Sequence, residues 1–174
     1  MPEVIFDGVV DTDYGQLDLV WHADGGFDGD WDRFFDGQVN GLAGAASGDA
    51  VYVNLARRSG GSSVRIVRHD AEPAISPTAE DVVEVSVTIP SGADVVWSSW
   101  GSESSGPLSL APNTYRVRVS AWGRDAGRDG ELADGLVDWY VIDLWHAAPR
   151  PDEIVRTTSA DAAYWHEEIG SRRP

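Results

Sequence analysis

The sequence predicts a mainly β fold: an antiparallel β-sandwich of about eight strands, with one inserted helix and a short C-terminal helical appendage. Three observations support this fold class. Apolar and polar residues alternate along many short segments, as they do in strands whose two faces meet different surroundings. Turn-forming residues separate these segments at regular intervals. Hydrophobic residues make up 42% of the 174 residues, which is enough apolar material for one buried core.

The strands of the first half follow from this alternation. They are expected in the apolar run that begins at Val4 and at residues 14–22, 48–57 and 63–70. The stretch RRSGGSS, rich in glycine and serine, lies between the last two segments and predicts a turn. Residues 48–57 and 63–70 are therefore expected to pair as a hairpin.

Residues 32–46 are the expected inserted helix. Apolar residues recur there at helical intervals, beginning with Phe34 and Phe35, which should turn inward. Three glycines in the same range lower its helix propensity. Asp30 or Asp32 would supply the N-cap, since an aspartate side chain accepts hydrogen bonds from the first helical N–H groups.

The second half predicts five further strands and a short helix. The strands are expected at residues 82–90, 93–101, 115–122 and 136–147, with one more short strand after Gly106. Residues 136–147 are nearly all apolar, which favours a central strand covered on both faces. Residues 124–135 are expected to form an acidic loop. A β-sandwich domain would span residues 1–147, and residues 148–174 would form the appendage, with a helix from Ser159.

The charge of the chain restricts its partners. It has 29 acidic and 13 basic residues, for a net charge of −16. This negative field repels nucleic acid and anionic membranes and attracts basic proteins or cations. Residues 1–10 carry neither the positive nor the apolar region of a secretion signal, and no apolar run is long enough to span a bilayer. We therefore expect a cytoplasmic protein that binds no nucleic acid and no membrane.

The stretch FDGDWDRFFDG suggests a calcium loop before anything else. Asp28, Asp30 and Asp32 occupy positions one, three and five of an EF-hand loop. Arg33 stands where the loop needs glycine, and Val39 stands where it needs a bidentate acid, so the sequence excludes an EF-hand. Two interpretations stay open: a solvated helix start, or a looser calcium site completed by another loop.

The sequence contains no local motif for catalysis or for binding a transition metal. The four histidines have neither the HxH nor the HxxxH spacing; they are His22, His69, His146 and His166. The chain has no cysteine, no G-x-S-x-G elbow and no phosphate-binding glycine loop. We therefore predict that the protein is not an enzyme and holds no cofactor.

Trp31 differs from the other seven tryptophans because Asp30 and Asp32 flank it. An aromatic ring inside an acidic cluster is typical of an interface anchor, where the ring supplies buried area and the acids steer the partner. Alternatively, Trp31 is a hydrophobic staple for its own helix. The sequence leaves both interpretations open.

Three segments resemble a known family. DYGQLDLVW (13–21) is similar to its early strand, with a Tyr-x-Gln-hydrophobic pattern, and residues 30–57 are similar to its Asp-Trp start, helix and following strand. Residues 114–145 resemble its closing unit, which ends here in DWYVID. The chain thus resembles the competence protein ComJ family, inhibitors that partner the bacterial DNA-entry nuclease. The glycine- and aspartate-rich segment 124–135 and the tail from residue 147 depart from that pattern.

The resemblance implies an inhibitory role, and the charge agrees with it. We predict an acidic protein-binding module, an inhibitor or immunity-type protein that covers the substrate channel of a basic nuclease or toxin with carboxylates in place of phosphates. The alternatives are a calcium- or carbohydrate-binding sandwich and a structural protein whose acidity keeps it soluble. The predicted partner-binding residues are Asp28, Asp30, Trp31, Asp32, Asp36, Asp125, Asp129, Glu131, Asp134 and Asp138.

Overall fold

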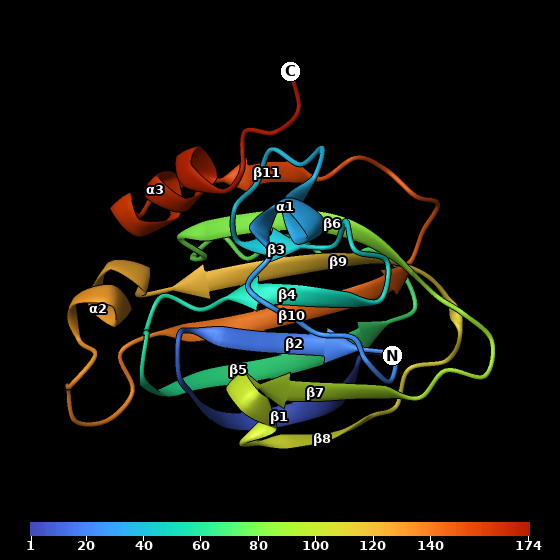
Figure 1. Ribbon diagram of the computed structural model, residues 1–174, viewed down its shortest axis with the longest axis horizontal. Coiled ribbons are helices and arrows are strands. Elements are labelled where there is room, and N and C mark those ends of the chain that lie inside the picture. The colour runs from blue at the N-terminus through green and yellow to red at the C-terminus, as the bar shows by residue number, and fades with distance from the viewer.

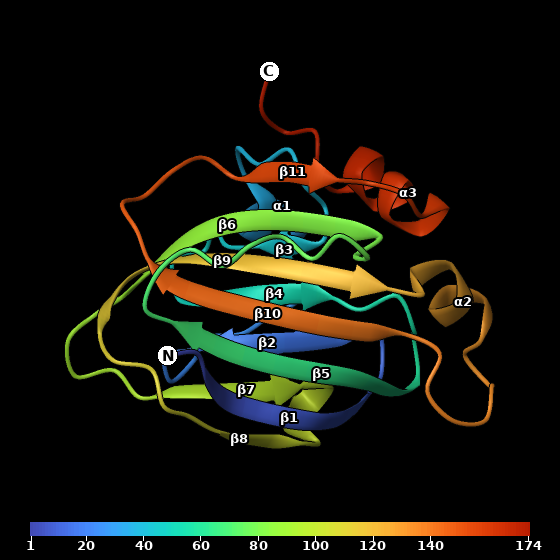
Figure 2. The ribbon, with the colours of Figure 1, turned by 180° about the vertical axis from the view of Figure 1, so that it is seen from behind.

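The computed structural model describes residues 1–174 and consists of two packed β-sheets (Figures 1 and 2). The six-stranded sheet contains, in spatial order, β1 (Glu3–Thr12), β5 (Gly60–His69), β10 (Trp139–His146), β9 (Asn113–Trp122), β6 (Asp81–Ile89) and β11 (Glu153–Arg156). The five-stranded sheet contains β3 (Ala43–Gly44), β4 (Ala50–Asn54), β2 (Gln16–Val20), β7 (Val95–Ser99) and β8 (Ser105–Leu108). The predicted fold class, a mainly β sandwich, is confirmed.

Three α-helices and one short 3-10 helix complete the fold. They are α1 (Trp31–Phe35), η1 (Trp100–Ser102), α2 (Arg124–Asp129) and α3 (Ala160–Glu168). Both ribbon views place α2 and α3 at the same end of the sandwich, beyond the ends of β9 and β4 (Figures 1 and 2). None of the helices is long and apolar enough to span a bilayer.

The main core lies between the two sheets. Each long strand turns alternate residues inward, and 26 buried residues form this core. On β9 the inward residues are Tyr115, Val117, Val119 and Ala121, as the alternation predicts. A second, smaller core of six buried residues forms beneath α1 and includes Phe34 and Phe35, which point inward as expected.

The outward face of β9 carries a buried ionic cluster. Nε of Arg116 donates to Oε2 of Glu84 at 2.9 Å, and Nε of Arg118 donates to Oε1 of the same carboxylate at 2.8 Å. The two guanidinium groups also donate to the backbone carbonyls of Pro73 and Pro151. Each long side chain is fully buried, so the cluster fastens the segment that precedes β11 onto the sheet.

The predicted hairpin of residues 48–70 is wrong. β4 lies in the five-stranded sheet, whereas β5 pairs with β1 in an antiparallel manner and with β10 in a parallel manner. The connecting segment crosses from one sheet to the other. The Arg57 guanidinium holds it there by donating to the carbonyls of Gly61, Ala133 and Gly135, contacts that no local turn pattern reveals.

The predicted helix of residues 32–46 is also wrong beyond its first turns, because α1 has only five residues. Gly37 adopts a φ of +68°, which is left-handed and ends the helix. Asp152 accepts hydrogen bonds from the N–H groups of residues 39 and 40. At Gly41 an added Cβ would lie 1.9 Å from the carbonyl oxygen of Trp165, so the chain there packs directly against α3.

Two expectations for the second half need correction and one is confirmed. Residues 124–135 were expected to form a loop, but their first half is α2. β10 is central, between β5 and β9, yet its outward residues Trp139, Val141 and Asp143 are only partly covered, so it is not enclosed on both faces. α3 begins where predicted: the Ser159 side chain is its N-cap and accepts from the N–H of Ala162.

Candidate partner-binding site

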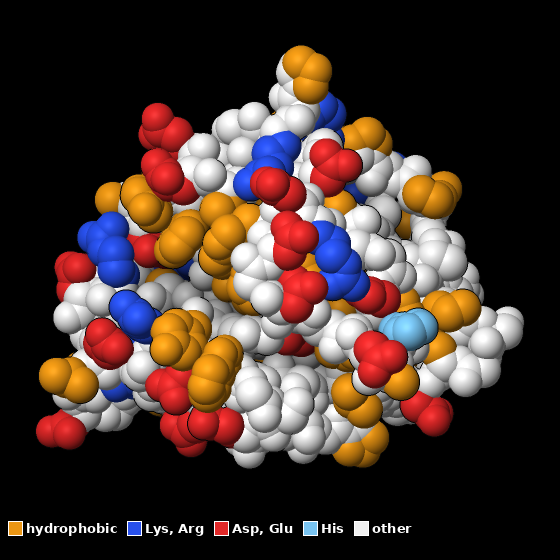
Figure 3. Space-filling view, in the orientation of Figure 1, with side chains coloured by type: hydrophobic (Ala, Val, Ile, Leu, Met, Phe, Trp, Pro, Cys, Tyr) orange, Lys and Arg blue, Asp and Glu red, His pale blue; other side chains and the backbone are white.

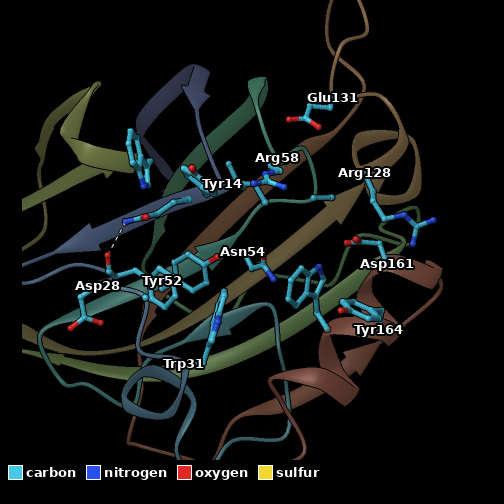
Figure 4. Close-up of a pocket in the computed structure, with 17 residues that line it drawn as sticks. Tyr14, Asp28, Trp31, Tyr52, Asn54, Arg58, Arg128, Glu131, Asp161 and Tyr164 are labelled. Atoms are coloured by element: carbon cyan, nitrogen blue, oxygen red, sulfur yellow. Dashed lines mark hydrogen bonds between the residues drawn. The ribbon is translucent and has the colours of Figure 1, made fainter.

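A hollow of about 730 Å³ opens where α1, α2 and α3 approach the five-stranded sheet (Figure 4). We call it the aromatic hollow, because seven of its 17 lining residues are aromatic: Tyr14, Phe27, Trp31, Tyr52, Trp100, Tyr164 and Trp165. In the space-filling view, apolar side chains gather there among acidic and basic groups (Figure 3). A large exposed apolar site with a charged rim is typical of an interaction surface.

Aromatic stacking builds one wall of the aromatic hollow. The Phe27 ring stacks on Tyr52 of β4, with ring centroids 4.1 Å apart, and Trp31 lies 4.5 Å from Phe27. Trp31 also lies 6.0 Å from Trp165 of α3. Offset and tilted ring pairs at these distances are stabilising, so three segments that are distant in sequence form one wall.

A buried carboxyl group positions that wall from behind. Oδ1 of Asp18 accepts the N–H of Phe27 at 3.2 Å, and its Oδ2 accepts Nε2 of Gln16 at 2.5 Å. Burial raises the pKa of the Asp18 carboxyl to about 6, although both hydrogen bonds oppose the rise. Asp18 thus holds the loop that carries Phe27 and Asp28.

The opposite wall depends on a buried ion pair between α2 and α3. Nε of Arg124 donates to Oδ2 of Asp161 at 2.9 Å, and another guanidinium nitrogen donates to the carbonyl of Asn54 on β4 at 2.7 Å. The Asp125 carboxylate accepts the backbone N–H groups of Ala160 and Asp161 at the start of α3. These bonds fix α3, and with it Tyr164 and Trp165, against the sheet.

The two predicted acidic segments meet at the aromatic hollow. Asp28 and Trp31 line it from the α1 side, and Glu131 lines it from the segment that follows α2. Asp129 and Asp134 are exposed beside Glu131, and Asp36 is exposed at the end of α1. Sequence alone could not place both segments at one site; their meeting depends on how α1 and α2 pack.

Five of the predicted surface residues have bonds within the chain: Asp28 is paired with Arg33, Asp129 is paired with Arg128, and the other three are Asp30, Asp32 and Asp125. Asp30 is the N-cap of α1 and accepts the N–H of Arg33 at 3.0 Å, which settles the choice between the two candidate caps. Asp32 is paired with Arg172. Asp125 caps α3, and its hydrogen bonds with the N–H groups of Asp161 and Ala160 lower its pKa. Each of these acids shapes the rim in addition to supplying charge.

Asp138 does not belong to the surface. It is fully buried, and its carboxylate accepts hydrogen bonds from the hydroxyls of Ser62 and Tyr140, at 2.7 and 2.8 Å. Its prediction as a contact residue rested on its neighbourhood in sequence. The start of β10 instead turns this side chain inward, so Asp138 is a structural residue.

The sequence did not identify Tyr14, Tyr52, Asp161, Tyr164 and Trp165 as site residues. Tyr52 lies in a regular strand, where an aromatic residue indicates core. The last three lie in residues 148–174, which were expected to pack on the sandwich or to extend from it, but no contact residue could be named there. Of the four aromatic residues among them, only Tyr14 is adjacent to an aspartate, Asp13, so the sequence carried no common signal for this set.

Comparison with known proteins places the fold. No protein-family model matches the chain, and no curated protein matches it in sequence. Among solved structures it is similar to ComJ from Bacillus subtilis, an inhibitor of the DNA-degrading activity of NucA, with a TM-score of 0.59 and 17% identity over 84% of this chain and 99% of ComJ. It is also similar to the crocagin biosynthetic gene J protein, with a TM-score of 0.57 and 20% identity over 85% and 99% of the two chains. The chain therefore has a ComJ-like fold.

Proposed function

We propose that this chain is an acidic protein-binding module that inhibits a basic nuclease or a similar toxin. The observation that carries the proposal is the position of the aromatic hollow between the two acidic segments, around Asp28 and Glu131. The likeness of the fold to ComJ, an inhibitor of a DNA-degrading activity, supports the same role.

Charge and apolar surface have different tasks in this mechanism. A net charge of −16 speeds the approach of a basic partner and orients it. Once the partner is seated, aromatic side chains that lose water hold the complex together and set its dissociation rate. Tyr14, Trp100 and Tyr164 are all exposed at the aromatic hollow and are the aromatic anchors we propose.

Inhibition follows from what a nuclease channel recognises. Such a channel binds the phosphates of DNA through basic side chains. The exposed carboxylates of Asp129 and Asp134 and the half-buried carboxylate of Glu131 would occupy those basic groups in place of phosphates. DNA and the inhibitor would then compete for one surface.

The test is inhibition of DNA degradation, with charge reversal on the rim. The probes are NucA and the nuclease encoded nearest to the gene of this chain. We expect the purified chain to slow at least one of them, and the double variant Glu131→Arg/Asp134→Arg to inhibit at least tenfold more weakly at low salt.

The matched control is Asp94→Arg/Glu153→Arg. Both of its acids are exposed, neither makes a side-chain hydrogen bond or ion pair, and neither lines the aromatic hollow. The control changes the net charge by the same amount, so it separates a local effect from a global one. Equal losses in the two double variants would contradict the assigned surface, and failure to inhibit either nuclease would contradict the proposed role.

A further inference from the structure

We infer that the aromatic hollow receives an arginine side chain of the partner, held between aromatic faces and carboxylates. This inference rests on the proposed function and names the chemical group that the site recognises. The evidence comes from the aromatic walls, from a guanidinium of the chain that already lies in the hollow, and from one unpaired carboxylate oxygen.

The tryptophan faces of the aromatic hollow are free of cations. The cation–π contacts within the chain use the rings of Phe34, Tyr14, Trp145 and Tyr140. None of them involves Trp31, Trp100 or Trp165, which all line the hollow. Tryptophan is the best aromatic partner for a cation, and arginine is the cation most often found on it.

One guanidinium group already uses the aromatic hollow in this way. The central carbon of the Arg58 guanidinium lies 5.1 Å from the ring centroid of Tyr14, and both residues line the hollow. The geometry is that of a cation–π contact. It indicates that rings on this surface can hold an arginine, and no cation of the chain lies on Trp31, Trp100 or Trp165.

Asp161 provides a carboxylate oxygen without a partner. Its side chain is only 2% exposed, and the Arg124 guanidinium approaches Oδ2 with both of its contacts, at 2.9 and 2.7 Å. Oδ1 accepts no hydrogen bond from the chain. Asp161 lines the aromatic hollow, and its carboxylate turns towards it beside Tyr164 and Arg128 (Figure 4). An acceptor that has no partner in the chain and opens onto the hollow can receive a hydrogen bond from a ligand that displaces water there.

A guanidinium suits these groups better than an ammonium or an apolar side chain. Its planar face stacks on Trp31 or Trp165, while its edge carries five donors for Asp161 and Glu131. Lysine has no planar face. A leucine side chain would leave the oxygen of Asp161 unpaired, and the single O–H of tyrosine could serve only one of the two carboxylates and brings no charge.

The arginines of the aromatic hollow do not reverse this preference. Arg128 is paired with both Asp125 and Asp129, and Arg58 lies on Tyr14. Of the three carboxylates that line the hollow, Asp28 is paired with Arg33 and Asp161 is paired with Arg124 through one oxygen, which leaves Glu131 and Oδ1 of Asp161 without a cation of the chain. The charge balance of the residues that line the hollow therefore favours one further cation.

The test uses small probes and the tryptophan indole N–H signals in two-dimensional NMR. N-acetyl-arginine amide should bind saturably and shift the signals of Trp31 and Trp165, while the signal of Trp139, which lies outside the hollow, stays in place. N-acetyl-citrulline amide has nearly the same shape without the charge and should bind at least tenfold more weakly. Equal binding of the two probes, tighter binding of N-acetyl-tyrosine amide, or no saturation by the arginine probe overturns the inference.

Variants separate binding from folding. Trp31→Leu should weaken binding of the arginine probe at least tenfold, and Glu131→Gln at least threefold, with the thermal midpoint of Glu131→Gln unchanged. Trp139→Leu and Glu153→Gln, the matched controls outside the hollow, should bind like the parent. Parent-like binding by Glu131→Gln and Trp31→Leu together contradicts the assigned site.

The two proposals fail separately. Binding of the arginine probe without inhibition of any nuclease would overturn the proposed function and support the assigned chemistry of the hollow. Inhibition that survives while the arginine probe does not bind would overturn the inference alone.

Discussion

Asp18, which holds one wall of the aromatic hollow in place, makes the stability of the protein depend on pH. Burial raises its pKa from 3.8 to about 6. The folded state therefore binds the Asp18 proton more tightly than the unfolded state does. This contribution to stability is fully present below pH 4 and is lost as pH rises through 6.

We predict that Asp18→Asn stabilises the protein at neutral pH. The amide keeps an oxygen for the N–H of Phe27 and carries no charge to bury, while its NH2 group requires the Gln16 amide to turn its own oxygen towards it. A shift of about two pKa units corresponds to roughly 3 kcal/mol, which is the upper limit of the expected gain in the free energy of unfolding at pH 7. Urea unfolding at pH 7 and at pH 3.5 measures it. The gain should vanish at the lower pH, and a gain of equal size at both values would contradict the account.

The burial of His166 makes the stability of the protein depend on pH in the opposite direction to that of Asp18. Burial lowers its pKa to about 4, and its Nδ1 accepts the N–H of Gly41 at 3.0 Å, which needs the neutral ring. Its contribution to stability is present above pH 6.5 and is lost as pH falls through 4. In the parent protein the two groups change the free energy of unfolding in opposite directions as pH rises: Asp18 lowers it and His166 raises it. In Asp18→Asn the free energy of unfolding should therefore rise from pH 4 to pH 6.5.

At the scale of elements, α2 and α3 are held by a buried pair, Arg124 and Asp161. Removal of one partner leaves a buried charge without compensation, which costs about 3–5 kcal/mol in comparable pairs. We predict losses of that order for Arg124→Met and for Asp161→Asn. The double variant should be less destabilised than the sum of the two single variants, and a double-mutant cycle in urea measures this difference. Strict additivity would contradict a direct ion pair.

The elements that the sequence predicts well are those whose pattern is local. β9 and β6 alternate cleanly and form where expected, and α3 starts at the cap that Ser159 supplies. The wrong predictions concern segments whose structure depends on contacts with residues far away in sequence. The helix expected at residues 32–46 stops early because Gly41 packs on α3 and Asp152 takes the backbone N–H groups, over 110 residues away in sequence.

In the candidate site, too, some features are visible in the sequence and others depend on contacts between distant residues. The acidic character of Asp28 and Glu131 is visible in composition, whereas their approach to one hollow is not. Tyr52 belongs to a sheet strand, and Trp165 to a helix whose position depends on the Arg124–Asp161 pair. Aromatic residues from several elements converge only in the folded molecule, so the hollow itself could not be predicted.

At the scale of the whole molecule, the net charge should affect mainly the rate of association. Exposed charges are screened within about 10 Å at 0.1 M salt. We predict that raising the salt from 50 to 500 mM slows association with a basic nuclease at least tenfold and changes dissociation much less. Stopped-flow fluorescence measures both rates. A main effect on dissociation would indicate that buried ion pairs, and not steering, dominate.

The affinity of aromatic variants for the nuclease tests most directly whether the aromatic hollow is the binding surface. Tyr164 lines the hollow and is 52% exposed, whereas Trp139 lies outside it and is 44% exposed, so the two are matched in exposure. We predict that Tyr164→Ala raises the dissociation constant at least thirtyfold, or about 2 kcal/mol, as expected for an interface anchor. Trp139→Ala should change it less than twofold. A parent-like affinity of Tyr164→Ala together with a large loss in Trp139→Ala would contradict the account.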